Sequence, residues 1–140
     1  MERPEQICES FEGPFAPPPS KEQFSEAERI LGHELPQILK QHYGYYDGFH
    51  GPTGAWFFYS LSKLIEMTIF LRGESYFPKF LQRAVALGDY GVGPCWLIEL
   101  ERPEVIVEWD AEMEGEERVP LEGALTDIWL GRKKWYEDVT

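Results

Sequence analysis

Basic residues and long apolar runs are both scarce in this sequence. Thirteen lysines and arginines stand against 25 aspartates and glutamates, which leaves a formal net charge of −12. A surface this acidic repels phosphate backbones and anionic membranes, so neither nucleic acid nor a membrane is expected as a partner. The longest nearly uninterrupted apolar stretch, Ala55 to Leu61, is far shorter than the roughly 20 residues that a membrane span needs.

Cysteine is also rare, and no secretory signal is visible. Cys8 and Cys95 form no C-x-x-C pair, which argues against a disulfide framework and favours two reduced thiols. Residues 1–13 contain four glutamates and no apolar run, unlike a signal peptide. We therefore expect a soluble, cytoplasmic protein.

The apolar content that is present is enough for one folded domain. The chain has 140 residues, of which 43% are hydrophobic and 15% aromatic, so it can bury a core without the help of a metal or disulfide. Residues 1–19 contain three consecutive prolines, Pro17 to Pro19, and are predicted to form an extended arm. Residues 20–140 are predicted to form a single domain.

Helical signals dominate the first half of the chain. Ser20 and Gln23 match a capping box, and Gly32 supplies the end of that helix. Pro36 suits the first position of a second helix, which Gly44 would end. An aromatic strand is predicted over Ala55–Ser60 and a third helix over about Ser62–Leu71, whereas residues 76–81 are ambiguous between helix and loop.

The second half of the chain reads as antiparallel strands with a final helix. Strands are predicted over Ala84–Leu87, Cys95–Leu100 and Val105–Trp109, and a short edge strand around Val119 and Leu121. Turns are expected from Gly88 to Gly93 and at Arg102-Pro103, and the last helix would place Leu125, Ile128 and Trp129 together. This order predicts an α+β fold with a largely antiparallel sheet of about four to six strands and helices on one side.

No motif makes a positive case for catalysis, a metal or a cofactor. His33-Glu34 lacks the second histidine of the zinc-protease helix motif, and Pro36 breaks that helix. His33, His42 and His50 have spacings that place no pair on adjacent helical turns, so we expect partly exposed surface histidines. The glycines from Gly88 to Gly93 have the wrong order for a nucleotide-binding loop and indicate a hairpin turn. We therefore predict a non-catalytic protein without metal or cofactor.

One feature rises above this background, a concentration of carboxylates late in the chain. Between Glu99 and Glu122 there are ten acidic and two basic residues. Two interpretations stay open: a solvated face that promotes solubility, or a docking surface for a basic protein. The residues assigned to partner binding, called the acidic cluster below, are Glu108, Asp110, Glu112, Glu114, Glu116 and Glu117.

A series of short motifs suggests a family. An "E…LG…LP" pattern is followed by an Asp-Gly turn, an aromatic strand and a glycine-containing hairpin, over about Ser20 to Leu130. In this order they resemble the SUKH superfamily, the Smi/Knr-type fungal cell-wall regulators and their bacterial relatives. Asp47 stands where that family usually has Asn. The residues that carry the resemblance are Glu28, Gly32, Leu35, Pro36, Asp47, Gly48, Trp56, Gly88 and Trp96.

The resemblance implies a scaffold that binds other proteins rather than an enzyme. Its signature residues have structural tasks: Gly32 ends a helix, Pro36 begins one, and Trp56 and Trp96 fill the core. Many bacterial members are immunity proteins that neutralise a cognate toxin, often a nuclease, whereas fungal members are interaction hubs for cell-wall synthesis and signalling. Two functions follow as expectations: an immunity protein that uses the acidic cluster against a basic toxin, or a regulatory module without a toxin.

Overall fold

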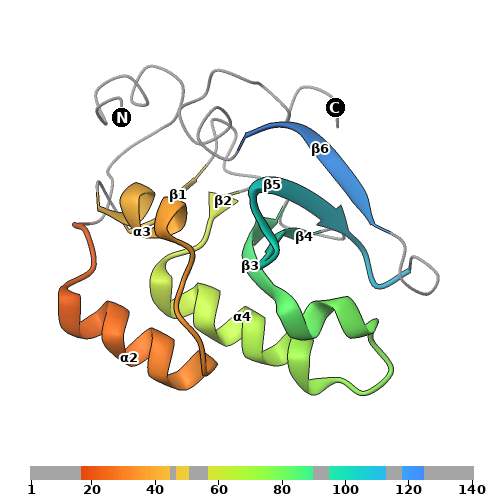
Figure 1. The fold of residues 1–140 in the computed structure, drawn as a ribbon, viewed down its shortest axis with the longest axis horizontal. Helices are drawn as coiled ribbons and strands as arrows, with labels where there is room; N and C mark the ends of the chain where they lie inside the picture. Colours follow the sequence, from red (N-terminus) through yellow and green to blue (C-terminus); the bar gives the residue numbers. More distant parts are fainter. Residues whose placement is uncertain (1–16, 45–46, 51–56, 90–94, 113–117, 125–140) are drawn as a thin grey trace.

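Helices and antiparallel strands both occur in the computed structural model, which describes residues 17–44, 47–50, 57–89, 95–112 and 118–124 (Figure 1). The elements are α2 (Lys21–Leu31), α3 (Gln37–Tyr43), β1 (Phe49–His50), β2 (Phe57–Phe58), α4 (Leu61–Gly73), the 3₁₀ helix η1 (Lys79–Arg83), β3 (Ala84–Asp89), β4 (Cys95–Glu99), β5 (Arg102–Trp109) and β6 (Val119–Ala124). The predicted α+β class is confirmed. The predicted last helix and the arm up to residue 16 lie outside the described residues.

The capping box predicted at Ser20 sets the start of α2. The Ser20 hydroxyl accepts a hydrogen bond from the Gln23 N–H at 3.2 Å, and the Gln23 side chain accepts one from the Ser20 N–H at 2.7 Å. The helix ends at Gly32, whose φ of 81° places it in the left-handed region. Ala27 and Leu31 are buried on the face that packs against the rest of the fold.

Glu28 joins α2 to α3. Its carboxylate accepts a hydrogen bond from the Leu35 N–H at 2.7 Å and lies 2.7 Å from the Lys40 ammonium. Burial alone would raise the pKa of Glu28, but the bonds from Lys40 and Leu35 outweigh it and lower that pKa. Pro36 precedes α3 as its N-cap, in an extended conformation, rather than as the first helical residue.

Two side chains define the start of α4. The Ser60 hydroxyl accepts a hydrogen bond from the Lys63 N–H at 3.2 Å, and the Asp47 carboxylate accepts one from the Leu61 N–H at 2.7 Å. These bonds satisfy backbone donors that a helix start otherwise leaves open. The helix extends beyond the predicted Ser62–Leu71 at both ends, to Leu61 and Gly73.

Gly48 allows the chain to pass very close to the segment that leads into α4. Its φ is 82°, and a Cβ atom built there would lie 2.7 Å from both the Phe58 carbonyl oxygen and the Ser60 nitrogen. Real Cβ atoms do not approach backbone atoms so closely. The Asp47-Gly48 turn predicted from the sequence therefore requires glycine for two reasons, conformation and space.

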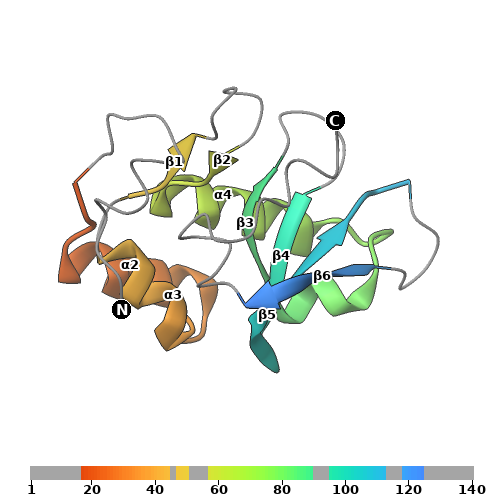
Figure 2. The same cartoon turned by 90° about the horizontal axis from the view of Figure 1, so that it is seen from above.

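The six strands form one antiparallel sheet in which each strand pairs with the next along the chain. Helix α4 packs against β3, and α2 packs on α4 (Figures 1 and 2). A side-chain bond ties helix to sheet, because the Ala86 N–H donates to the Thr68 hydroxyl at 3.0 Å. The sheet size and the helices on one side agree with the prediction.

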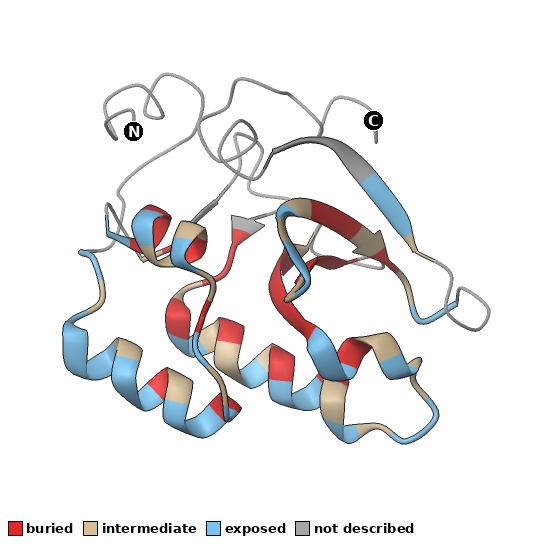
Figure 3. Cartoon of the chain, viewed as in Figure 1, coloured by how far each residue is buried: buried red, intermediate tan, exposed pale blue. Residues whose placement is uncertain are grey.

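The core lies around β3 and β4, which are buried on both faces (Figure 3). Trp96 is completely buried, and its ring lies 5.8 Å from that of Phe58. The expectation that Trp96 fills the core is confirmed, whereas Trp56 lies outside the described residues. Since side chains alternate between the two faces of a strand, a run of buried residues such as Cys95–Ile98 means that both faces are covered.

Two predicted turns were misplaced. Gly88 and Asp89 belong to β3, where they pair with Trp96 and Cys95, and Gly88 does not have a positive φ. Arg102 and Pro103 begin β5, because Glu99 pairs with Arg102. The chain reverses two residues before the predicted turn, over residues 100–101. Pro103 is tolerated because the ladder is irregular just there. The predicted edge strand is confirmed as β6.

Among the described residues, no helix has the length and apolar character that crossing a bilayer demands.

Three alanine substitutions should separate the two reasons for glycine at Gly48. Gly73→Ala, with open space around it, should leave the free energy of unfolding unchanged or raise it by up to about 1 kcal/mol. Gly32→Ala, with space but a positive φ, should lower it by about 1–2 kcal/mol. Gly48→Ala should lower it by more than about 2 kcal/mol, because steric overlap adds to strain. Urea unfolding checks this order, and equal losses at Gly32 and Gly48 would contradict it.

Candidate partner-binding surface

The described part of the acidic cluster lies where β5 ends. Asp110 follows the last strand residue and is half-buried, and its carboxylate accepts a hydrogen bond from the Glu112 N–H at 3.1 Å. Glu112 is exposed, whereas Glu108 is half-buried within the strand. The remaining predicted members, Glu114, Glu116 and Glu117, lie outside the described residues.

A carboxylate that the sequence analysis did not assign, Asp89, lies at the same end of the sheet. Asp89 and Trp109 both pair directly with Cys95, one from each neighbouring strand. Burial, and then the charges of Asp89, Asp110 and Glu108, raise the pKa of the Cys95 thiol to about 12. Three carboxylates from two strands therefore act on the first residue of β4.

The same environment argues against Cys95 as a nucleophile. The thiolate is the reactive form of cysteine, and nearby cations or a helix N-terminus favour it. Cys95 has carboxylates around it instead, and its side chain is buried. Tyr59, whose hydroxyl donates a hydrogen bond to Asp89, likewise has its pKa raised, by burial first and then by that carboxylate.

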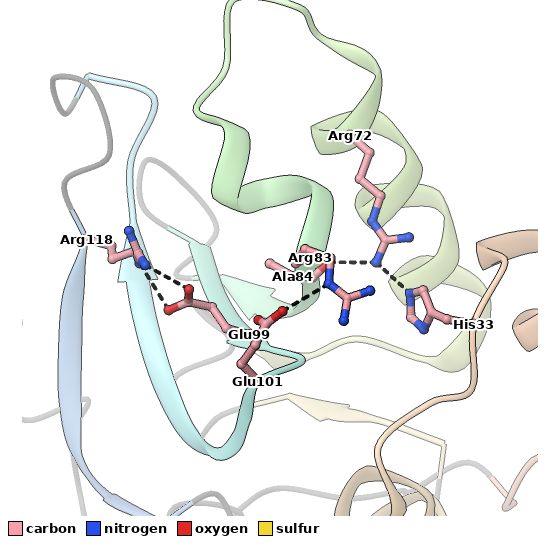
Figure 4. Close-up of polar contacts among 7 residues, drawn as sticks. All are labelled: His33, Arg72, Arg83, Ala84, Glu99, Glu101 and Arg118. Atoms are coloured by element: carbon pink, nitrogen blue, oxygen red, sulfur yellow. Dashed lines mark hydrogen bonds and ion pairs between the residues drawn. The ribbon is translucent and has the colours of Figure 1, made fainter.

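Glu99 and Glu101, which the sequence places beside the acidic cluster, are neutralised by arginines (Figure 4). Arg118 donates two hydrogen bonds to the Glu99 carboxylate, at 2.8 and 3.0 Å, and Arg83 donates one to Glu101 at 3.0 Å. The Arg118 guanidinium also lies 4.2 Å from the centre of the Phe80 ring. Two of the carboxylates that the sequence places near the acidic cluster therefore form ion pairs within the fold, whereas Glu112 at the end of the hairpin is exposed.

The prediction of partly exposed histidines is wrong for His42, agrees with His33, and is not tested at His50. His42 is completely buried, and its Nδ1–H donates to the Ile38 carbonyl at 2.6 Å. His33 is half-buried and accepts a hydrogen bond from Arg72 at 2.7 Å through Nε2 (Figure 4). His50 belongs to β1, but its side chain lies outside what the structure describes.

Arg72 is occupied by the fold as well. Its guanidinium donates to the Leu31 carbonyl at 3.3 Å and to the Ala84 carbonyl at 3.0 Å, so it ties α4 to the end of α2 and the start of β3. Burial lowers the pKa of Arg72. Among the residues that the structure describes, no three histidine, cysteine or acidic side chains gather in a way that could hold a metal ion.

A known protein family matches most of the chain. Residues 18–128 match the model described as the SMI1 / KNR4 family (SUKH-1). The chain belongs to this family. None of the curated proteins compared with it gives a significant match. Domains of the SUKH family are generally non-catalytic and serve immunity or regulation.

Within this SUKH domain, the signature residues that the structure describes hold the frame together. Glu28 fixes Leu35 and Lys40, Asp47 caps α4, and Gly48 permits the close approach beside it. Trp96 fills the core beside Glu108, with which it pairs across β4 and β5. The family pattern therefore identifies the scaffold, and it does not by itself mark a binding surface. The sequence motif included Glu28 and Asp47 but could not predict their hydrogen bonds, because the backbone groups that they bind are 7 and 14 residues away along the chain.

Replacement of Arg118 by lysine should destabilise the protein, because Arg118 both stacks on Phe80 and forms two bonds to Glu99. Arg118→Lys should lower the free energy of unfolding by about 1 kcal/mol, because an ammonium cannot form two parallel bonds to Glu99 while stacking on Phe80. Arg29→Lys is the matched control: Arg29 pairs with Glu26, but its side chain is 70% exposed, and such pairs contribute little. Urea unfolding of both variants tests this, and equal effects would contradict it.

His42 should make stability depend on pH. Burial lowers the pKa of His42 below its usual 6.5, so below that pH the unfolded chain binds a proton that the folded chain excludes. The free energy of unfolding should therefore fall as pH decreases through this range, by up to about 1.4 kcal/mol per pH unit. His42→Gln should flatten the slope measured between about pH 5 and 7, where carboxyl groups contribute less; an unchanged slope would contradict the assignment.

Proposed function

We propose that this SUKH domain is an immunity protein that binds and neutralises a cognate toxin domain, such as a nuclease, through the acidic cluster. The observation that supports it is the uneven distribution of charge. Glu99 and Glu101 are paired with arginines, whereas no ion pair among the described residues involves Asp110 or Glu112, which follow β5. Like charges in one place oppose folding, so a partner that neutralises them would be stabilising.

Electrostatics explains why a toxin fits this surface. A domain that cleaves nucleic acid must attract phosphates, so it carries basic patches. A negative surface on the inhibitor accelerates the encounter and orients the two proteins, with carboxylates at the rim acting mainly on the association rate. An interface of ordinary size would bury about 800 Å² on each partner, which is more than the end of one hairpin provides.

The alternative is a regulatory or scaffolding module that acts on proteins of its own cell. Family membership is compatible with either role, so the two must be separated by experiment. An immunity gene is expected beside a toxin gene, whereas a regulator needs no such neighbour. The first step is therefore to read the adjacent genes and to co-express any toxin domain found there with this chain.

Removal of charge from the acidic cluster should slow toxin binding. A quadruple variant replaces four carboxylates by amides: Glu112→Gln, Glu114→Gln, Glu116→Gln and Glu117→Gln. Its association rate should fall by about tenfold at low salt and should depend much less on salt concentration, whereas its dissociation rate should change less. The matched control removes four exposed carboxylates elsewhere, at Glu22, Glu26, Glu34 and Glu104. Surface plasmon resonance against the immobilised toxin domain gives both rates.

Two results would count against the proposal. Equal association rates for the two quadruple variants would show that total charge, rather than the acidic cluster, governs the encounter. Failure of this chain to protect cells from the toxin encoded beside it would favour the regulatory alternative.

A further inference from the structure

Two large aromatic side chains, one in the second half of α4 and one in the turn after it, are exposed and share a neighbour. Phe70 is 49% exposed and Tyr76 is 76% exposed. Both rings contact Phe77, with centroid distances of 6.0 and 4.8 Å. A single exposed apolar residue is ordinary, but a connected patch marks an interaction site more often. Phe70 lies in α4 and Tyr76 in the turn between α4 and η1, much of which is coloured exposed or intermediate in Figure 3.

The exposed rings continue into the core as a single row. Phe77 lies 5.1 Å from the ring of Trp109, and Phe80 lies 6.4 Å from it, both edge to face. Trp109 is only 3% exposed, so the outer rings rest on a fixed base. We call Phe70, Tyr76, Phe77, Phe80 and Trp109 the aromatic row. Rings held in place lose little conformational entropy when a partner binds, which suits them to be anchors.

The charges around the aromatic row select a cationic occupant. Asp110 and Glu112 follow Trp109 directly, and Glu74 precedes Tyr76 in the same turn. Arg72 is directed inward onto backbone carbonyls, which leaves Lys79 as the exposed cation in residues 72–79. Figure 1 shows the turn between α4 and η1 beside the end of β5, and the contact of Phe77 with Trp109 joins the two. Asp110 and Glu112 therefore lie within three residues of the aromatic row.

The protein already contains the arrangement that such an occupant would make. Arg118 is held between the Phe80 ring, 4.2 Å away, and the Glu99 carboxylate. A planar guanidinium can stack on an aromatic face and at the same time bond to a carboxylate, whereas an ammonium does this less well. Tyr76 and Phe77 offer further rings, and among the described residues no arginine stacks on either of them.

We propose that the aromatic row is the anchoring part of the partner interface and that it takes an arginine-rich face of a basic protein. This rests on the proposed function, that the domain acts by binding a protein, and adds the place and chemistry of the contact. The rings form the centre of the interface and control how long the complex lasts. The acidic cluster forms its rim and controls how fast the complex assembles.

The first test uses the toxin domain encoded beside this chain. Tyr76→Ala combined with Phe70→Ala should raise the dissociation rate by more than about tenfold and leave the association rate nearly unchanged. Ile30→Ala is the matched control, because Ile30 is 42% exposed on α2 and is not part of the row. Since Phe70 and Tyr76 are exposed, the double variant should fold normally, which circular dichroism checks. An unchanged dissociation rate would overturn the proposal.

The second test needs no toxin. Hexa-arginine and hexa-lysine peptides are titrated into the full chain, and the ring resonances of Phe70, Tyr76 and Phe77 are followed by NMR. Hexa-arginine should shift these resonances at concentrations several-fold lower than hexa-lysine, and Tyr76→Ala should weaken its binding. Equal effects of the two peptides, or shifts confined to Asp110 and Glu112, would overturn the arginine assignment.

The two tests fail in distinguishable ways. If no toxin is found but hexa-arginine selectively shifts the row, the immunity role fails and the row stands as an arginine-binding surface. Self-association is a further outcome: if the chain dimerises in analytical ultracentrifugation and Tyr76→Ala makes it monomeric, the row serves a second copy of this chain and the proposal is wrong.

Discussion

Burial of β3 and β4 on both faces is the constraint on which the rest of the structure depends. Trp96, Leu97 and Ile98 are completely enclosed, so the middle of these strands can offer nothing to a partner. Elements that could act must lie at the ends of the sheet or beyond it, and polar groups near the core must be satisfied within the protein. Thr68, bonded to the backbone of β3, shows how this is done where α4 meets the sheet.

Some carboxylates of this protein form ion pairs with arginines, and others do not. Arg118 and Arg83 join neighbouring elements by bonding to Glu99 and Glu101. The largely buried Arg118–Glu99 pair strengthens the frame, whereas the exposed Arg83–Glu101 pair adds little. Asp110 and Glu112 are bonded to each other in a local turn and form no ion pair with the other described residues, and a chain with a net charge of −12 has few cations to offer them. Charge and exposed aromatic surface thus come together at one place, where β5 ends against the turn after α4.

Local signals in the sequence predicted local structure well. The capping box at Ser20 and the glycine at Gly32 gave both ends of α2, because the bonds involved span only a few residues. Pro103 misled the prediction, since proline usually marks a turn but here enters a strand where the ladder is irregular. The pairing of Arg118 with Glu99 spans 19 residues, and the burial of His42 depends on how α3 packs. Neither follows from periodicity, so the extent of the acidic surface could not be read before the fold was known.

The order of the sheet has a kinetic consequence. Each strand pairs with the one made just before it, so pairing requires no strand to wait for a distant partner, and low contact order of this kind favours rapid folding. Helix α4, between β2 and β3, is the longest described insertion in the series. The strands would leave the ribosome in the same order in which they pair. The sheet can therefore grow from one edge to the other during synthesis without rearrangement.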